Sequence, residues 1–244
     1  MSVMKREIQE KLLALNREFY ERFGASFSAS RFGPQPGWDR IIPYFARRCA
    51  VLDLGCGNGR FALFLDRHLE QVRYVGLEGS ETLLRIAREQ TAGLQHVQAT
   101  LIPTDLTTSD WAVGFHEFDV VVALAVVHHI PGFAARAAFV RQAAWCMKPE
   151  GVLILSTWRF THNARMRRKL LPWATIGLSE ADIEPGDYLL DWKREDVRGV
   201  RYAHELDQEE VSRLAALAGL RVVEQFVADG REGDLSLYSI LKRG

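Results

Sequence analysis

The sequence lacks any apolar stretch long enough to cross a membrane. No run approaches the roughly 18 consecutive apolar residues that a transmembrane helix needs, so the sequence excludes an integral membrane protein. Residues 1–23 carry charges of both signs and contain no apolar segment followed by a small-residue cleavage site. No secretory signal is therefore expected.

Cysteine is scarce. Cys49, Cys56 and Cys146 are widely spaced, odd in number and form no C-x-x-C pair, which argues against a disulfide framework and against a zinc site. The pair His128-His129 also lacks a third ligand at a suitable spacing, so no metal is expected. This cysteine usage fits a reducing, cytoplasmic compartment.

The sequence carries no net charge, because 31 Lys and Arg residues balance 31 Asp and Glu residues. There is consequently no global attraction to nucleic acid, and no motif of an RNA-binding module is present. Charge is nevertheless uneven along the chain. Segment Arg159–Lys169 holds five cations and no carboxylate. It is either a solvated surface or a contact for RNA phosphates.

What the sequence does contain is a large apolar fraction arranged in alternating patterns. A chain of 244 residues that is 48% hydrophobic can bury a substantial core, and no repeat or Gly/Ser linker divides it, so we expect one domain, 1–244. Helical patterns over 60–68, 81–89 and 133–147 alternate with strand-like runs. This order predicts βαβ units and a parallel sheet that is buried on both faces. The strand-like runs are residues 50–54, 72–77, 96–102, 118–124 and 152–158.

The flanking segments differ from this core. Residues 3–23 and 38–45 read as helices around a Ser/Gly/Pro-rich loop at 24–37, which together form an N-terminal helical lid, 1–48. After the core at 49–158 comes a small insert at 159–206. Residues 207–244 read as a helix followed by a β-hairpin, which predicts an antiparallel strand at the edge of the sheet.

The strongest local pattern is VLDLGCGNGRF, residues 51–61, in which a buried strand leads into three glycines and then a helix. Such glycines let the backbone turn sharply near a ligand, although an ordinary tight turn is the alternative. Arg60 replaces the third glycine of the dinucleotide motif, and no G-K-[ST] follows, which disfavours a nicotinamide or P-loop enzyme. Glu78 ends the second strand about twenty residues later, where a carboxylate can accept both ribose hydroxyls.

These motifs, together with KPEGVLIL at 148–155, resemble the class I S-adenosylmethionine-dependent methyltransferases over about residues 49–158. The resemblance implies a Rossmann-like, doubly wound sheet of seven mostly parallel strands, with S-adenosylmethionine as the cofactor. Asp53 and Gly55 would lie near its methionine portion, Glu78 at the ribose and Asp105 at the adenine. The full set of implied cofactor-binding residues is Asp53, Gly55, Gly57, Asn58, Glu78, Gly79, Asp105, Leu106 and Leu124.

A second resemblance covers the flanks. FSASRFGPQPGW (27–38), ALAVVHHIPGFAAR (123–136), STW (156–158) and RYAHELDQEEV (201–211) are similar to segments of the tRNA wobble-uridine carboxymethyl methyltransferases. This implies methyl transfer to a carboxyl group of a modified wobble uridine in tRNA. The positions carried over are Arg31, His128, His129, Arg136, Arg201, Tyr202 and His204, of which Arg31, His128, Arg201 and His204 are predicted to be catalytic.

The chemistry of such a reaction agrees with these residue types. A carboxylate is a competent nucleophile at neutral pH and needs no general base, so the enzyme has only to orient it, and Arg does this bidentately. We predict that Arg31 and Arg201 converge with His128 over the strand ends. Two alternatives stay open, namely transfer to a small metabolite and a non-catalytic regulatory or scaffold protein that binds S-adenosylmethionine. The sequence indicates no particular protein partner.

Overall fold

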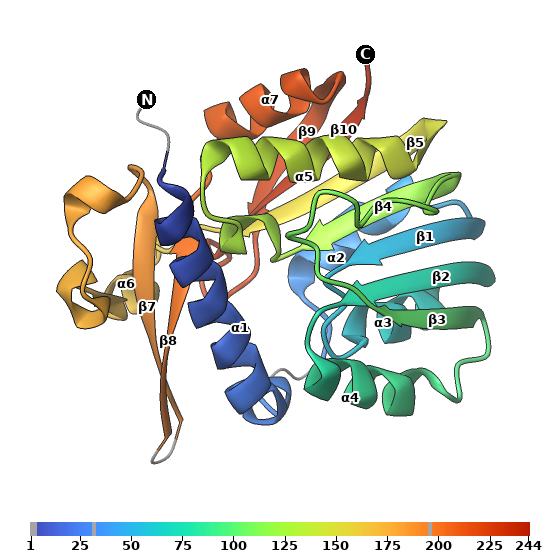
Figure 1. Ribbon diagram of the computed structural model, residues 1–244. Helices are drawn as coiled ribbons and strands as arrows, with labels where there is room; N and C mark the ends of the chain where they lie inside the picture. The colour runs from blue at the N-terminus through green and yellow to red at the C-terminus, as the bar shows by residue number, and fades with distance from the viewer. Residues whose placement is uncertain (1–3, 31–32, 195–196) are drawn as a thin grey trace.

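The computed structural model describes residues 4–30, 33–194 and 197–244. Its main element is a seven-stranded sheet of order β3-β2-β1-β4-β5-β10-β9, in which β1 to β5 run parallel (Figure 1). The doubly wound, mostly parallel sheet predicted from the alternating patterns is therefore confirmed. Its strands are β1 (Arg48–Leu54), β2 (Gln71–Glu78), β3 (Val97–Pro103), β4 (Phe118–Leu124), β5 (Met147–Trp158), β9 (Leu220–Ala228) and β10 (Ser236–Arg243).

The C-terminal hairpin docks in an order that the sequence did not predict. Strand β10 is antiparallel, but it lies between β5 and β9, so the edge strand is β9. The physical reason is burial on both faces. Six successive residues from the start of β10 are buried, whereas β9 carries Arg221, Glu224 and Gln225, which an edge position leaves partly accessible.

Helices cover both faces of this sheet. α5 (Phe133–Cys146) and α7 (Gln208–Leu217) pack on one apolar core, while α2 (Pro36–Ile41) and α3 (Arg60–His68) pack on the other (Figure 1). α4 (Glu81–Thr91) starts directly after β2, where the Ser80 side chain accepts a hydrogen bond from the Leu83 backbone N–H. The short 3₁₀ turns are η1 (Ile42–Tyr44), η2 (Val127–His129), η3 (Trp173–Ile176) and η4 (Glu180–Asp182).

The N-terminal helix α1 (Arg6–Ser28) is longer than expected, because residues 24–28 continue it instead of starting a loop. Gly24 lies where the helix approaches Thr82 and Leu83 of α4, and a Cβ built there would be 3.4 Å from the Thr82 side chain. A glycine in the helix interior costs about 1 kcal/mol relative to alanine, and this close packing offsets that cost. The prediction of a loop over 24–28 was wrong for this reason.

The insert forms a second, three-stranded antiparallel sheet of order β6-β7-β8, which the sequence did not predict. Its elements are α6 (Ala164–Arg167), β6 (Leu170–Leu171), β7 (Asp187–Arg194) and β8 (Val197–His204). α1 lies between this sheet and the main one, as Figure 1 shows. Leu12 of α1 packs with Leu189 and Tyr202 in a separate apolar cluster. Among the described residues, no helix is long and apolar enough to cross a membrane.

Candidate active site

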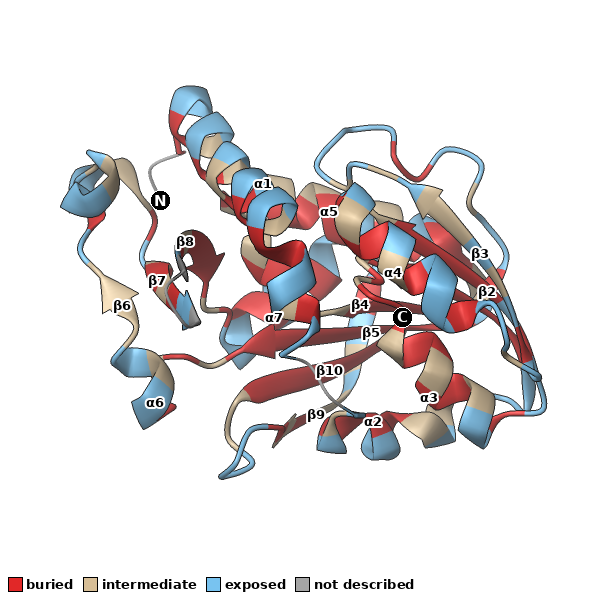
Figure 2. Cartoon of the chain, turned by 90° about the horizontal axis from the view of Figure 1, so that it is seen from below, coloured by how far each residue is buried: buried red, intermediate tan, exposed pale blue. Residues whose placement is uncertain are grey.

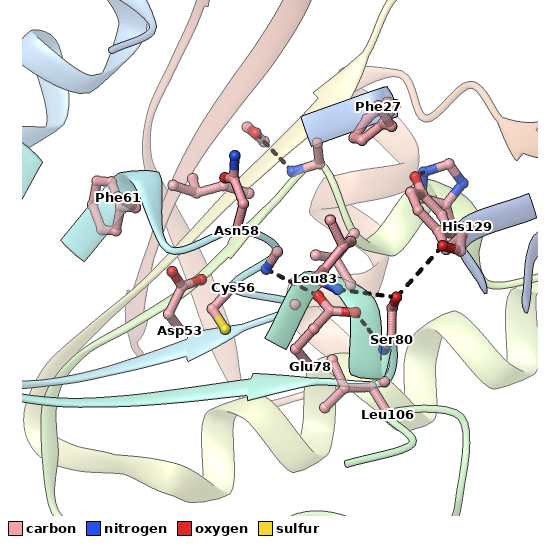
Figure 3. A pocket seen from close by; sticks show the side chains of 18 of the residues that line it. Phe27, Asp53, Cys56, Asn58, Phe61, Glu78, Ser80, Leu83, Leu106 and His129 are labelled. Carbon is pink, nitrogen blue, oxygen red and sulfur yellow. Dashed lines mark hydrogen bonds between the residues drawn. The ribbon is translucent and has the colours of Figure 1, made fainter. Parts of the chain in front are cut away.

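A pocket of about 340 Å³ lies at the carboxyl ends of β1, β2, β4 and β5, beneath α1. This is the edge at which a doubly wound sheet binds its ligand. All nine residues predicted to bind the cofactor line this one pocket, and Figure 3 shows several of them facing it. They are Asp53, Gly55, Gly57, Asn58, Glu78, Gly79, Asp105, Leu106 and Leu124. Their contact with a cofactor remains a prediction.

The glycine-rich turn after β1 leaves room for a ligand. Gly55, Gly57 and Gly59 all have positive φ angles, of 75°, 57° and 80°, which L side chains rarely adopt. A Cβ on Gly55 would lie 2.6 Å from the Val126 side chain, whereas a Cβ on Gly57 would meet no atom within 4 Å. Because Gly57 also lines the pocket, its open side is available to a ligand.

Glu78 stands at the end of β2 and is fixed by backbone donors. One carboxylate oxygen accepts from the Gly57 N–H at 2.9 Å and the other from the Ser80 N–H at 2.8 Å (Figure 3). Burial raises the pKa of Glu78, and the hydrogen bonds from Ser80, Gly57 and Gly79 oppose that shift. Each oxygen keeps a further lone pair, so the pre-oriented carboxylate can still accept two hydroxyl groups.

Asp53, at the end of β1, is a buried carboxyl group on the same pocket wall. It is only 2% exposed, and the Tyr74 hydroxyl donates to it at 2.5 Å. The pKa of Asp53 is raised to about 7; burial is the main cause, the Tyr74 hydrogen bond opposes it, and the nearby Glu78 carboxylate adds to it. No cationic side chain contacts Asp53 among the described residues. A cationic group of a ligand would therefore stabilise its ionised form.

This elevated pKa predicts how stability depends on pH. The folded protein holds a proton on Asp53 that the unfolded chain, with a carboxyl pKa near 3.9, releases. The ligand-free protein should therefore lose stability as the pH rises from about 4 to 7. Asp53→Asn should remove that dependence and stabilise the ligand-free protein at pH 8 by roughly 1–4 kcal/mol.

Urea unfolding at pH 5 and pH 8 measures this effect, with Asp110→Asn, in the segment between β3 and β4, as a control for an exposed carboxylate. If wild-type and Asp53→Asn proteins change stability equally between the two pH values, Asp53 is ionised in both states and the prediction is wrong.

The opposite end of the pocket, beyond β3, is closed by α1. Arg17 of α1 lies 3.2 Å from one oxygen of Asp105, and the Thr107 backbone N–H donates to the other oxygen at 2.9 Å. The Asn58 side chain of the glycine turn donates to the hydroxyl of Ser28, also from α1. Residues at the predicted cofactor end are thus tied to the N-terminal helix.

Aromatic side chains line the remaining part of the pocket, near β4 and β5; they are Tyr20, Phe27, His129 and Trp158. The Nδ1 atom of His129 is 3.1 Å from the Tyr202 carbonyl oxygen, and its Nε2 atom is 3.0 Å from the Tyr20 hydroxyl. A carbonyl oxygen can only accept, so Nδ1 carries a proton, and the Tyr20 hydroxyl forms a hydrogen bond with Nε2. These two contacts fix the orientation of the His129 ring.

Of the predicted catalytic residues, Arg31 lies outside the described residues, and the structure places the other three behind the pocket wall. His128 is fully buried and does not line the pocket; its ring lies 4.5 Å from that of Trp158. The neighbouring His129 lines the pocket instead. His204 is buried between Asp187 and Glu210, away from the lining residues.

Arg201, on β8, is a buried cation beside the aromatic part of the pocket. It is 3% exposed, and its guanidinium carbon lies 4.6 Å from the ring centre of Trp158 and 5.4 Å from that of Phe27. Burial lowers the pKa of Arg201, and its hydrogen bond to Tyr20 opposes that shift. Within the described ranges, its Nε and Nη1 atoms have no hydrogen-bond partner and no carboxylate pairs with it.

Asn16 is a residue of this region that sequence reasoning missed. Its side-chain oxygen accepts from the Tyr202 N–H at 2.8 Å, and its amide donates to the Tyr202 carbonyl at 3.1 Å. It also lies 3.4 Å from the His129 carbonyl oxygen, so one side chain of α1 joins β8 to η2. The available signal was its position four residues after Leu12, inside the apolar stripe of the predicted helix.

Comparison with known proteins shows what this chain resembles. Residues 52–153 match the family model described as a methyltransferase domain. A protein of Encephalitozoon cuniculi that is named as a methyltransferase is 29% identical to this chain over 227 residues. The aligned region covers 92% of this chain and 93% of that protein. The tRNA (carboxymethyluridine(34)-5-O)-methyltransferase of Macaca fascicularis is 26% identical over 156 residues. These residues make up 62% of this chain but only 22% of the macaque protein.

Two further matches concern other acceptors and the fold. A trans-aconitate 2-methyltransferase of Acidovorax is 33% identical over 42% of this chain and 36% of its own length. The magnesium protoporphyrin IX methyltransferase of Synechocystis, solved with bound SAH, superposes with a TM-score of 0.67 at 16% identity and covers 95% of this chain and 99% of its own. The last similarity is one of fold.

Proposed function

We propose that this chain, an S-adenosylmethionine-dependent methyltransferase of class I, methylates a carboxylate, and that this carboxylate belongs to a modified wobble uridine in tRNA. In this proposal the core at 49–158 holds the cofactor, while the N-terminal lid (1–48) and the insert (159–206) supply the contacts to the acceptor. The three free cysteines are all buried, which agrees with the cytoplasmic location expected from the sequence.

Arg201 is the observation that carries the proposal for the acceptor. A buried charge without a counter-ion is strongly destabilising, so a guanidinium kept in such a position needs an anion at some stage of function. Trp158 and Phe27 line the pocket and lie against Arg201. A carboxylate that enters between these rings would meet an Nε–H or Nη1–H group that has no hydrogen-bond partner within the described residues.

The named relatives support the same chemistry. Carboxymethyluridine and trans-aconitate, from which two of them take their names, are both carboxylates. The first joins a carboxylate to a nucleobase in tRNA and the second is a small metabolite. A carboxylate acceptor is thus common to the leading proposal and to its metabolite alternative, and the two differ in what surrounds the carboxylate.

In this reaction the protein has mainly to orient the acceptor carboxylate toward the methyl group of the cofactor. Bound S-adenosylmethionine supplies a methyl group on a positively charged sulfur. Glu78 would hold the ribose, and Asp53 would face the cationic part of the methionine. Arg201 would aim the acceptor oxygen along the line of the breaking bond, and positioning of this kind supplies roughly 7–11 kcal/mol of a barrier. The hydrogen-bonded His129 and Tyr20 side chains would border the acceptor, and neither has to remove a proton from a carboxylate.

A basic surface lies on the insert, next to this end of the molecule. Arg165, Arg167 and Arg168 are exposed, and none of them forms an ion pair with a described residue. Together with Arg159 and Lys169 they make up the cation-rich segment seen in the sequence. We assign this segment to phosphate contacts with tRNA, because its exposed arginines have no carboxylate partner within the described residues.

This assignment predicts salt-dependent binding. The logarithm of tRNA affinity should fall linearly with the logarithm of salt concentration, and Arg167→Ala should reduce the slope by about one. Fluorescence anisotropy with a labelled tRNA anticodon stem–loop measures both slopes. Arg88→Ala on α4 serves as the control for an exposed arginine elsewhere. A slope that is unchanged in Arg167→Ala, or no binding at low salt, would favour the metabolite alternative.

Transfer of labelled methyl from S-adenosylmethionine tests the function directly. The acceptors are an anticodon stem–loop with 5-carboxymethyluridine at position 34 and, separately, trans-aconitate. The proposal expects a base-labile methyl ester on the stem–loop. Ester formed only on trans-aconitate would support the metabolite alternative, and cofactor binding without transfer to either would support a scaffold role. Nucleoside mass spectrometry of tRNA from cells with and without the protein gives the corresponding result in vivo.

A further inference from the structure

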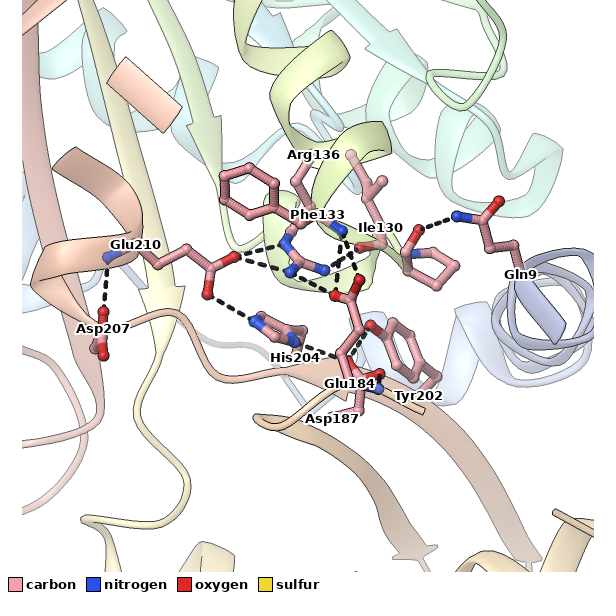
Figure 4. A network of polar contacts seen from close by, with 11 residues as sticks. Gln9, Ile130, Phe133, Arg136, Glu184, Asp187, Tyr202, His204, Asp207 and Glu210 are labelled. Carbon is pink, nitrogen blue, oxygen red and sulfur yellow. Dashed lines mark hydrogen bonds and ion pairs between the residues drawn. The ribbon is translucent and has the colours of Figure 1, made fainter. Parts of the chain in front are cut away.

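A buried network of charged side chains joins the insert to the main sheet. Arg136 of α5 lies 2.8 Å from a Glu210 oxygen and 3.0 Å from a Glu184 oxygen. His204, at the end of β8, lies between Glu210 and Asp187 (Figure 4). All five side chains are less than a tenth exposed. The end of β8 is coloured as buried in Figure 2. Water therefore screens these charges weakly.

The contacts of His204 define its protonation. Its Nδ1 atom is 2.7 Å from an Asp187 oxygen, and its Nε2 atom is 2.8 Å from a Glu210 oxygen. The Tyr202 hydroxyl already donates to that Asp187 oxygen, and Arg136 donates to the other oxygen of Glu210. Both carboxylates thus act as acceptors, so both ring nitrogens must donate, and only the imidazolium has two N–H groups.

The groups around His204 agree with this charge. Burial by itself would lower the pKa of His204, and the hydrogen bonds to Asp187 and Glu210 outweigh it, so the pKa is raised. Arg136 is the cation that opposes the shift. Tyr202 of the same strand also faces Asp187. Burial and the Asp187 carboxylate raise the pKa of Tyr202, so it stays a neutral phenol. With the imidazolium and Arg136, two cations face the three carboxylates of Asp187, Glu184 and Glu210.

This trio of Glu184, Asp187 and His204 also has the spacing of a metal site. Its atoms are already occupied. Glu184 pairs with Arg136 and accepts from the Phe133 N–H, and both nitrogens of His204 donate to carboxylates. A cation bound here would have to displace the imidazolium, so the cluster is a charge-paired joint between two parts of the fold.

The joint reaches both sides of the aromatic part of the pocket. His204 follows Arg201 and Tyr202 on β8, and the Tyr202 carbonyl fixes the His129 ring at Nδ1. Arg136 donates to the Ile130 carbonyl at 3.2 Å, directly after His129. The strand that carries Arg201 and the turn that carries His129 are therefore attached to one network.

We propose that His204 is a positioning residue whose imidazolium holds the end of β8 against α5 and α7, and thereby places Arg201 and His129 at the acceptor part of the pocket. The effect that His204 has on activity rests on the proposed role of Arg201. The placement of the strand itself does not depend on which acceptor is used. Loss of the ring proton would leave one carboxylate facing an acceptor nitrogen, which destabilises the joint.

The first test needs no acceptor. In ¹⁵N spectra of the ligand-free protein, His204 should show two protonated ring nitrogens at pH 7.5, and hydrogen exchange at the Tyr202 amide should accelerate beyond the expected pH effect once His204 deprotonates. Asp187→Asn keeps an acceptor for Tyr202 but removes one counter-charge, so the His204 titration should move to lower pH. Asp191→Asn is the control. Asp191 lies on the same strand as Asp187 but pairs with exposed Arg198, so its replacement should leave the His204 titration unchanged.

The second test uses the anticodon stem–loop with 5-carboxymethyluridine. The alkaline fall in kcat/KM should move to lower pH in Asp187→Asn, while the Kd for S-adenosylmethionine stays constant. About half of the activity should be lost at the pH where His204 is half-deprotonated, and about tenfold one pH unit above it. A single-nitrogen ring signal for His204 at pH 7.5, or a titration unmoved by Asp187→Asn, would overturn the proposal. If the spectra behave as expected but Arg201→Lys is fully active, the role of Arg201 has failed and the joint stands.

Discussion

Glu78→Ala is expected to weaken the binding of S-adenosylmethionine by about 10²-fold or more. Each ribose hydroxyl would donate a hydrogen bond to the charged carboxylate, and such a bond contributes roughly 1.5–3 kcal/mol. Each lost bond therefore weakens binding by about tenfold or more, and Glu78→Ala loses two of them. The structure adds a second contribution, because the Glu78 oxygens also accept from Gly57 and Ser80 and so fix the glycine turn beside them. Calorimetric titration measures the change.

Two controls separate ligand contact from loss of the turn. Glu81→Ala, in the exposed first turn of α4, should bind the cofactor as the wild type does. Glu78→Gln keeps one acceptor oxygen for the backbone and should bind more tightly than Glu78→Ala but more weakly than wild type. A folded Glu78→Ala protein with wild-type affinity would remove Glu78 from the cofactor site.

Arg201→Lys should lower kcat/KM for the carboxylate acceptor by about 10²-fold, with the affinity for S-adenosylmethionine nearly unchanged. Lysine keeps the charge but replaces a planar fork by a single ammonium group, so orientation is lost and attraction is retained. The packing of Arg201 against Trp158 and Phe27 also requires a flat group. Arg198→Lys, on the same strand but exposed, is the matched control.

The pH dependence of the wild-type reaction checks the same mechanism. A carboxylate acceptor needs no general base, so the rate should show no acidic limb near neutrality. A strong acidic limb that disappears on replacing His129 would contradict this, because it would indicate that the His129–Tyr20 pair removes a proton from a hydroxyl or amine acceptor. Full activity of Arg201→Lys would contradict the role of Arg201.

The cofactor side of the pocket could be predicted because its residues are local in sequence. Asp53, Gly57 and Glu78 stand at the ends of strands, and parallel strands bring those ends to one edge of the sheet. The sequence also predicted the ends of the elements that have a strong apolar periodicity. Helix α3 and strand β4 begin and end at the predicted residues. Nothing more than the order of the elements was needed to place these side chains together.

The acceptor side could not be predicted in the same way, because it is assembled from α1, η2, β5 and β8. Which of two adjacent histidines lines the pocket depends on the 3₁₀ turn at 127–129, and that turn buries His128. His204 appeared in sequence as a catalytic candidate, yet its partners Asp187 and Glu210 meet it only through the folding of β7 and α7. The position of Asn16 inside the apolar stripe of the predicted helix indicated burial, but not that its partner would be the Tyr202 backbone.

The two sides of α1 are held by contacts of very different strength. Toward β8 the helix makes the buried contacts of Asn16 with the Tyr202 backbone. Toward the segment after β3 it makes the ion pair between Arg17 and Asp105, both of which are about half exposed. Exposed pairs of this kind contribute about 0–1 kcal/mol, and high salt screens them. The gap between α1 and the segment after β3 is therefore the easiest part of the pocket to open. Spent cofactor can leave by that route without separating α1 from β8, so exchange of the cofactor need not disturb the aromatic end of the pocket.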